Sequence, residues 1–161
     1  MKHQLQSFAY AFKGLYRAIC CEGHLRFHFV AAFYVLIFSA FYDFSTTQYG
    51  VIILLIAAVI GAELVNTSVE NLCDLYTRRH RSAIRIAKDV AAGAVLVISI
   101  AAAAVAAVFF LDFEVLKTIP AFFAEHIPLL ALLIISAVCA FIFVWKGPKG
   151  IAAWFRKKKN K

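Results

Sequence analysis

The chain has 161 residues, of which 63% are hydrophobic, and its mean hydropathy is +0.82. Soluble domains are only about half apolar, so this composition excludes an ordinary soluble protein and predicts an all-α integral membrane protein. The net charge of +8 does not indicate nucleic-acid binding, because the basic residues gather in clusters between apolar runs, as in a membrane topology.

The amino-terminal segment, residues 7–23, has an amphipathic pattern. Phe8, Phe12, Tyr16 and Ile19 follow one helical stripe, with charged residues between them. The segment is too charged to span a membrane, and we expect a helix that lies in the membrane surface. The alternative is that it opens a long first membrane helix.

Four apolar runs follow and are the candidate membrane spans, of which the first is short unless it is extended at its amino-terminal end. The first is 27–42, extended back through Leu25, and the second is 49–75. Asp89 is expected to open the third helix, whose apolar part is 90–111.

The fourth apolar run is 127–145, with Pro128 in its first turn, where proline is tolerated. Gly147, Pro148 and Gly150 are expected to end this helix. The basic tail that follows, 151–161, is expected to lie against anionic headgroups.

Charge distribution predicts the topology. Basic clusters precede the first run, separate the second from the third, and follow the fourth, while the other two loops carry mainly acidic residues. By the positive-inside rule, both termini and the 76–88 loop are cytoplasmic, and the loop with Asp43 and the 112–126 loop face outward.

Four polar side chains interrupt the second apolar run: Glu63, Asn66, Glu70 and Asp74. At about 100° per residue they fall within about 80° of arc, so one helix face carries three carboxylates and an amide. Ionisable groups at membrane depth are costly and mark functional sites. Carboxylates this close repel one another, and a bound divalent metal is the simplest remedy.

Two alternatives for this acidic face are a set of buried groups that bridge helices, and a pathway for protons or cations. The chain is short for a transporter, however, and shows no pair of broken helices.

A second carboxylate near the membrane surface is Glu22, just before the first span. Alone it reads as a solvated interface glutamate. Together with Glu70, it suits Mg²⁺, which is held by one or two carboxylates with water and phosphate oxygens.

Lys88 and Asp89 stand where the third helix is expected to begin. Lysine serves as a point charge for phosphate, and a helix amino terminus favours anions. Four neighbouring arginines add positive charge, although the positive-inside rule alone would explain them: Arg78, Arg79, Arg81 and Arg85. The sequence lacks the motifs GxxxxGK[ST], GxGxxG and HExxH. It therefore contains no standard P-loop, glycine-rich nucleotide loop or zinc-protease motif.

These residues together describe a site that opens to the cytoplasm and reaches lipid at Glu63. Phosphoryl transfer from a soluble nucleotide to a lipid hydroxyl fits this layout. Glu63 would be the base or the group that orients the hydroxyl.

Three blocks, 8–15 with Glu22, 63–74 and 86–96, read FAYAFKGL, ELVNTSVENLCD and IAKDVAAGAVL. In their order and spacing they resemble the small prokaryotic diacylglycerol kinase and undecaprenol kinase family.

The resemblance implies an ATP- and Mg²⁺-dependent lipid kinase of the bacterial inner membrane, a homotrimer with shared sites, a surface helix and three core spans. By position, Glu63 is the catalytic base and Asn66 supports it in the lipid site, while Glu22 and Glu70 bind metal and nucleotide. The remaining nucleotide-binding positions are Tyr10, Asp74, Arg79, Arg81, Lys88 and Asp89.

Residues 1–111 then form the kinase core, and 112–161 add a fourth helix and a basic tail without assigned chemistry. The substrate implied first is undecaprenol, and the alternative is diacylglycerol. A small ion-coupled carrier or a non-catalytic membrane protein is a more distant reading.

Overall fold

The computed structural model of the protein describes residues 2–75 and 81–159. Every regular element within these residues is a helix, which confirms the all-α prediction. In chain order the elements are α1 (Lys2–Cys21), α2 (Gly23–Phe38), the 3-10 helix η1 (Ser39–Phe41), α3 (Thr46–Leu75), α4 (Arg81–Phe110), α5 (Phe113–Glu125) and α6 (Ile127–Lys159).

Within the described residues, four helical segments are long and apolar enough to cross a membrane. They are Gly23–Phe41, Thr46–Leu75, Ser82–Phe110 and Ile127–Trp154. The expected number of spans is therefore confirmed, and the chain has the composition of a multi-pass membrane protein.

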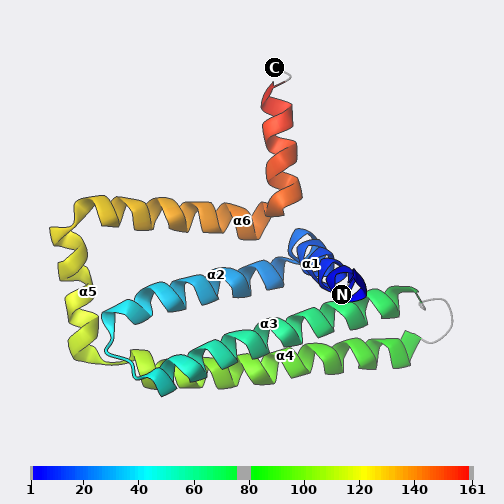
Figure 1. Cartoon of the computed structure of the whole chain (residues 1–161), viewed down its shortest axis with the longest axis horizontal. Coiled ribbons are helices and arrows are strands. Elements are labelled where there is room, and N and C mark those ends of the chain that lie inside the picture. Colours follow the sequence, from blue (N-terminus) through cyan, green and yellow to red (C-terminus); the bar gives the residue numbers. More distant parts are fainter. Residues whose placement is uncertain (1, 76–80, 160–161) are drawn as a thin grey trace.

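The long helices lie roughly side by side (Figure 1). α3 and α4 run antiparallel in close contact, α2 packs on α3, and the first half of α6 packs on α2. At one end α5 joins α4 to α6. Near the other end α1, the start of α2 and the bend in α6 come together, and α1 also contacts α3.

Little of this apolar surface is buried within one chain. Leu25, Ile52 and Val59 belong to the small buried core, whereas the most apolar stretches of α4 and α6 contain no buried residue. Exposed apolar helix faces are stable only against lipid or another protein surface. The fold is therefore that of a protein surrounded by membrane or partner subunits.

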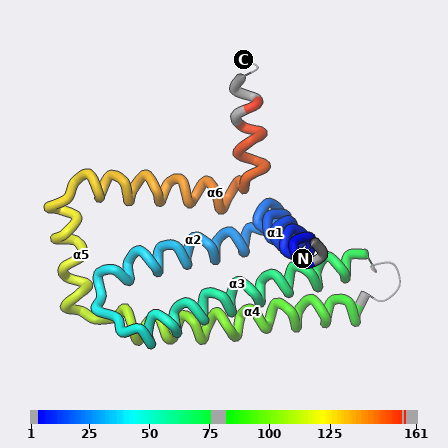
Figure 2. Tube along the Cα trace, viewed as in Figure 1, coloured from blue at the N-terminus to red at the C-terminus, as the bar shows by residue number. Residues whose placement is uncertain are grey.

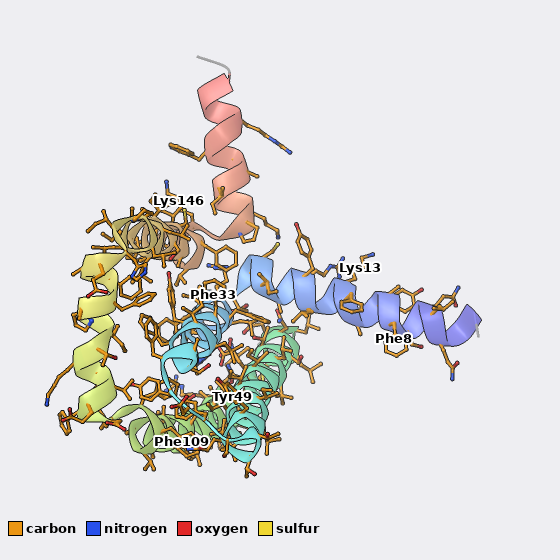
Figure 3. All side chains as sticks on the ribbon, turned by 60° about the vertical axis from the view of Figure 1, so that its left-hand side comes forward. Phe8, Lys13, Phe33, Tyr49, Phe109 and Lys146 are labelled. Carbon is orange, nitrogen blue, oxygen red and sulfur yellow. The ribbon has the colours of Figure 1, made fainter. Side chains whose placement is uncertain are left out.

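Aromatic side chains fasten the end of the bundle near η1. Tyr42 Oη donates a hydrogen bond of 2.8 Å to the Phe110 carbonyl at the end of α4. Tyr49 Oη reaches the Ser39 carbonyl at 3.3 Å, and the Phe44 ring contacts the rings of Tyr42 and Phe110. Figure 3 shows labelled Tyr49 and Phe109 at this same end.

The amino-terminal helix is separate from the first span. Glu22 is extended (φ −101°, ψ 120°) and ends α1 before α2 begins at Gly23. This break contradicts the alternative of one continuous long helix. Figure 2 shows α1 leaving the bundle at a steep angle to α2.

The expected start of the third helix at Asp89 is wrong, because α4 begins at Arg81. Hydropathy marks only the apolar part of a helix. The polar turns from Arg81 to Lys88 contain no glycine or proline, so nothing in them stops the helix. Ile84 and Lys88 continue, at a spacing of four, the half-buried stripe that runs down α4.

The 112–126 segment, expected to be a loop, contains α5. The Asp112 carboxylate caps this helix by accepting hydrogen bonds from the backbone N–H of Glu114 at 3.0 Å and of Val115 at 3.4 Å. Such a cap satisfies N–H groups that have no partner within the helix.

The fourth long helix bends where it was expected to end. Gly147 has φ 63° and ψ 171°, a conformation that favours glycine, and Pro148 follows it. Gly147 is not helical, so the expected end of the apolar helix at this glycine is confirmed, and a second helical stretch then follows and continues to Lys159. Pro128 lies in the first turn of α6, as predicted.

Candidate functional site

The acidic face of α3 is graded in burial along the helix. Glu63 is 5% exposed and Asn66 is 9% exposed, Glu70 is half-buried, and Asp74 is exposed. The face therefore begins inside the helix bundle and ends at the surface beside the 76–80 segment. A carboxylate as buried as Glu63 is costly to keep charged without a partner.

Asn66 joins two levels of this face. Its Nδ2 donates a hydrogen bond of 3.0 Å to Glu70 Oε1, one turn further along α3. Its Oδ1 is buried and accepts no hydrogen bond from the described part of the chain. Because buried acceptors are rarely left unpaired, Asn66 Oδ1 is an acceptor available to a bound hydroxyl or water.

At the exposed end of the face, Lys88 of α4 pairs with Asp74. Lys88 Nζ lies 2.5 Å from Asp74 Oδ1, and the two side chains are 34% and 66% exposed. Asp89, the next residue, is exposed. Lys88 lies about two turns inside α4, so the predicted assistance from a helix amino terminus at this position is wrong.

The predicted residues on α1 lie at different depths. Glu22 is half-buried where α1 meets α2, and Tyr10 is 71% exposed on α1. Arg79 lies outside the described residues. Arg81 is the first residue of α4, and its side chain is likewise outside what the structure describes.

For a metal, the site offers only oxygen donors in small number. Among residues 2–75 and 81–159, no three His, Cys, Asp or Glu side chains gather closely enough to hold an ion by themselves. One or two carboxylates completed by water and phosphate oxygens are the usual Mg²⁺ arrangement. Glu70, held by Asn66 and half-buried, fits that requirement, and Glu22 is a second donor of the same type.

An apolar cavity of about 290 Å³ lies between α2, α3 and α4. Most of its lining is alanine, aliphatic or aromatic side chains, and its polar members include His28 and Ser99. Ile60 lines it one turn before Glu63, and Glu63 is an ionisable neighbour of His28. The cavity therefore extends along the bundle from the buried end of the acidic face.

Two polar residues here were not predicted as part of any site. Ser99 Oγ is buried beside the cavity and has no hydrogen-bond partner in the described residues. Arg26, at the start of α2, is only 7% exposed. In the sequence, Arg26 belongs to a basic cluster before an apolar run, and this pattern indicates membrane topology only. The sequence does not show which carbonyl groups surround its side chain.

The fold and this site define a small multi-pass membrane protein whose carboxylates lead from a polar end into an apolar interior. Residues 9–110 match the family model described as prokaryotic diacylglycerol kinase. The chain belongs to this family, which the sequence blocks had indicated.

Two characterised relatives are similar to the chain. Undecaprenol kinase of Bacillus subtilis (strain 168) is 35% identical over 106 residues, which cover 66% of this chain and 86% of that protein. Diacylglycerol kinase of Synechocystis sp. (strain ATCC 27184 / PCC 6803 / Kazusa) is 33% identical over 99 residues, 61% of this chain and 57% of that protein. No solved structure matches the chain significantly.

Both relatives and the family carry kinase names, and both relatives' names give a lipid alcohol. The protein is therefore a membrane lipid kinase, which uses a nucleotide and a lipid as its substrates. The interpretation made from the acidic face and the three sequence blocks is confirmed at this level.

Proposed function

We propose that the protein transfers the γ-phosphoryl group of ATP to the hydroxyl of undecaprenol. The observation that carries the proposal is the graded acidic face of α3, which runs from buried Glu63 to the exposed Asp74–Lys88 pair. A lipid hydroxyl and a water-soluble nucleotide approach from opposite ends of such a face.

In the transfer step, the lipid hydroxyl oxygen attacks the γ-phosphorus and the bond from that phosphorus to the β,γ-bridging oxygen breaks, releasing ADP. Glu63 receives the hydroxyl proton as general base. Asn66 Oδ1 is a suitable acceptor to orient that hydroxyl beforehand, because it has no partner in the described residues. Burial of Glu63 excludes water that would otherwise compete as acceptor.

Mg²⁺ bound by Glu22 and Glu70 would neutralise charge on the transferring phosphate. Asn66 keeps Glu70 in place through its 3.0 Å hydrogen bond. Lys88 supplies positive charge to the phosphates and is itself oriented by Asp74. Tyr10, Asp89, Arg79 and Arg81 complete the proposed nucleotide pocket.

The apolar cavity between α2, α3 and α4 supports a hydrocarbon chain as the part of the substrate that enters the bundle. Its lining is almost wholly apolar and reaches the turn before Glu63. Undecaprenol is favoured because the undecaprenol kinase relative is matched over most of its length. Diacylglycerol is the second candidate, since the other relative is a diacylglycerol kinase.

We further propose a homotrimer with shared sites, in the bacterial inner membrane, with both termini cytoplasmic. The proposal is supported by the exposed apolar faces of α4 and α6. Such faces need to be covered by lipid or by partner subunits. α1 would lie in the membrane surface, and Figure 3 shows its Phe8 and Lys13 on different sides of the helix. Residues 1–111 are the proposed kinase core, and 112–161 are an addition to it.

The proposal is tested by replacing Glu63 with glutamine, which keeps the shape of the side chain but removes the base. Transfer to lipid should fall by about 100-fold or more, while nucleotide affinity, measured by calorimetry on purified protein, should stay within about twofold because Glu63 lies at the lipid end. Glu125→Gln, at an exposed position of α5, is the matched control. Full turnover by Glu63→Gln would remove Glu63 from the role of base.

A further inference from the structure

Arg26 is a buried cation that the proposed transfer does not use. It lies in the first turn of α2, is 7% exposed, and donates two hydrogen bonds to other helices. Nε reaches the Val144 carbonyl of α6 at 3.1 Å, and Nη1 reaches the Ile19 carbonyl of α1 at 3.0 Å. We call this set, Arg26 with the carbonyls of Ile19 and Val144, the Arg26 junction.

Both carbonyls lack the donor that a continuous helix would give them. In an α-helix a carbonyl accepts from the N–H four residues later. For Val144 that residue is Pro148, which has no N–H. For Ile19 it is Gly23, which lies beyond the extended residue Glu22. Arg26 therefore caps two helix ends at once, where the negative ends of their dipoles favour a cation.

The bend in α6 is shaped to admit the guanidinium group. A Cβ at Gly147 would lie 2.8 Å from Arg26 Nη1 and 2.9 Å from Arg26 Cζ, closer than carbon and nitrogen atoms pack. Gly147 also has φ 63°, which favours glycine over other residues. Gly147 and Pro148 thus create both the unpaired carbonyl and the space for Arg26.

Glu22 lies within the segment that the Arg26 junction holds. It is the single residue between α1 and α2, and its carbonyl accepts a 3.4 Å hydrogen bond from the Arg26 backbone N–H. One residue before it, Cys21 Sγ lies 3.7 Å from Lys149 Nζ of α6. Figure 1 shows the end of α1, the start of α2 and the bend of α6 meeting at this point.

We propose that the carboxy-terminal helix α6 positions Glu22 for metal binding, acting through the Arg26 junction. The family match ends at residue 110, so this gives the added segment a role in the reaction of the core. Arg26, Gly147 and Pro148 are positioning residues that touch no substrate. The inference rests on the proposed function in one respect, that Glu22 binds the metal.

The sharpest variant is Pro148→Ala. It supplies an N–H four residues after Val144, which lets the bend at Gly147 straighten into a continuous helix that satisfies this carbonyl, so that Arg26 loses its partner. Alanine is also the better helix former, so the change does not weaken α6 as a helix. Pro128→Ala is the matched control, because Pro128 lies in the first turn of α6, at the opposite end of its apolar half.

The measurement is the Mg²⁺ concentration that gives half-maximal transfer by the full-length enzyme, together with the KM for lipid. Pro148→Ala should raise the half-saturating Mg²⁺ concentration by about tenfold, because loss of a residue that orients a metal ligand typically weakens metal binding by that much. The same variant should leave the KM for lipid unchanged. Arg26→Lys, which keeps the charge but not the two-directional guanidinium, should act in the same direction. Pro128→Ala should change neither quantity.

Loss of thermal stability or of maximal rate in Pro148→Ala and Arg26→Lys, with unchanged Mg²⁺ dependence, would overturn the inference and leave a structural role only. Glu22→Gln distinguishes the two proposals. If it raises the Mg²⁺ requirement and Pro148→Ala does not, the role of the junction fails and the metal role of Glu22 stands. If Glu22→Gln leaves the requirement unchanged, the metal role fails, and the inference with it.

Discussion

At the scale of single residues, the position of each polar group along α3 decides what it can contact. Glu63 and Asn66 are nearly inaccessible to water, while Asp74 is exposed and paired with Lys88. An exposed ion pair contributes at most about 1 kcal/mol to stability, so the Asp74–Lys88 pair is better explained by orientation of the lysine than by folding. The hydrogen-bonded pair of buried Asn66 and half-buried Glu70 connects the two regions.

Glu70→Ala should weaken binding of Mg²⁺–nucleotide by about 10-fold or more, because it removes an oxygen proposed to bind the metal and the partner of Asn66 Nδ2. Nucleotide titrations with and without Mg²⁺ measure this, and the difference between the two should shrink. Ser68→Ala, at an exposed position two residues earlier, serves as the control. Unchanged affinity in the presence of Mg²⁺ would argue against a metal role for Glu70.

At the scale of helices, the apolar spans could be predicted from sequence, and so could the shared face of Glu63, Asn66, Glu70 and Asp74. Both depend on periodicity within one helix. The start of α4 could not be found from hydropathy, because the turns from Arg81 to Lys88 are polar yet helical. Helix α5 was missed because apolar runs indicate membrane spans, and its 13 residues are too few to form one.

The Arg26 junction was also out of reach of sequence reasoning. Arg26 and Val144 are 118 residues apart in the sequence. The acceptor is a backbone carbonyl, which every residue has, so the type of residue at position 144 does not indicate this contact. In retrospect, Gly147–Pro148 inside an apolar helix indicated an unpaired carbonyl one turn earlier. The partner of that carbonyl becomes visible only when α6 packs beside α2.

The cavity between α2, α3 and α4 gives a test at the level of helix packing. Ala102→Phe should partly fill it, because Ala102 lines it, and should raise the KM for lipid by about 10-fold while the KM for ATP stays unchanged. Ala104→Phe, an exposed position of α4 that does not line the cavity, is the control. Steady-state kinetics in mixed micelles separate the two constants. An equal rise in both constants would contradict a role in lipid binding.

At the scale of the whole molecule, one chain leaves much apolar surface uncovered, and its described residues gather few side-chain donors for the proposed Mg²⁺. The most apolar stretches of α4 and α6 contain no fully buried residue, and the described residues hold no three-residue metal cluster. Both features agree with an enzyme completed by its surroundings: lipid, nucleotide phosphates and, as proposed, other protomers. The carboxy-terminal helix then adds to this core by holding the junction of α1 and α2.

The central claim, phosphoryl transfer from ATP to undecaprenol, is tested most directly by following labelled γ-phosphate in time with purified protein. Undecaprenol, diacylglycerol and ceramide are offered separately in the same micelles, with Glu63→Gln as the inactive reference. We predict that undecaprenol is phosphorylated fastest, with kcat/KM at least about 10-fold above that for diacylglycerol. Faster transfer to diacylglycerol would reassign the substrate, and transfer to none of the three lipids would contradict the account.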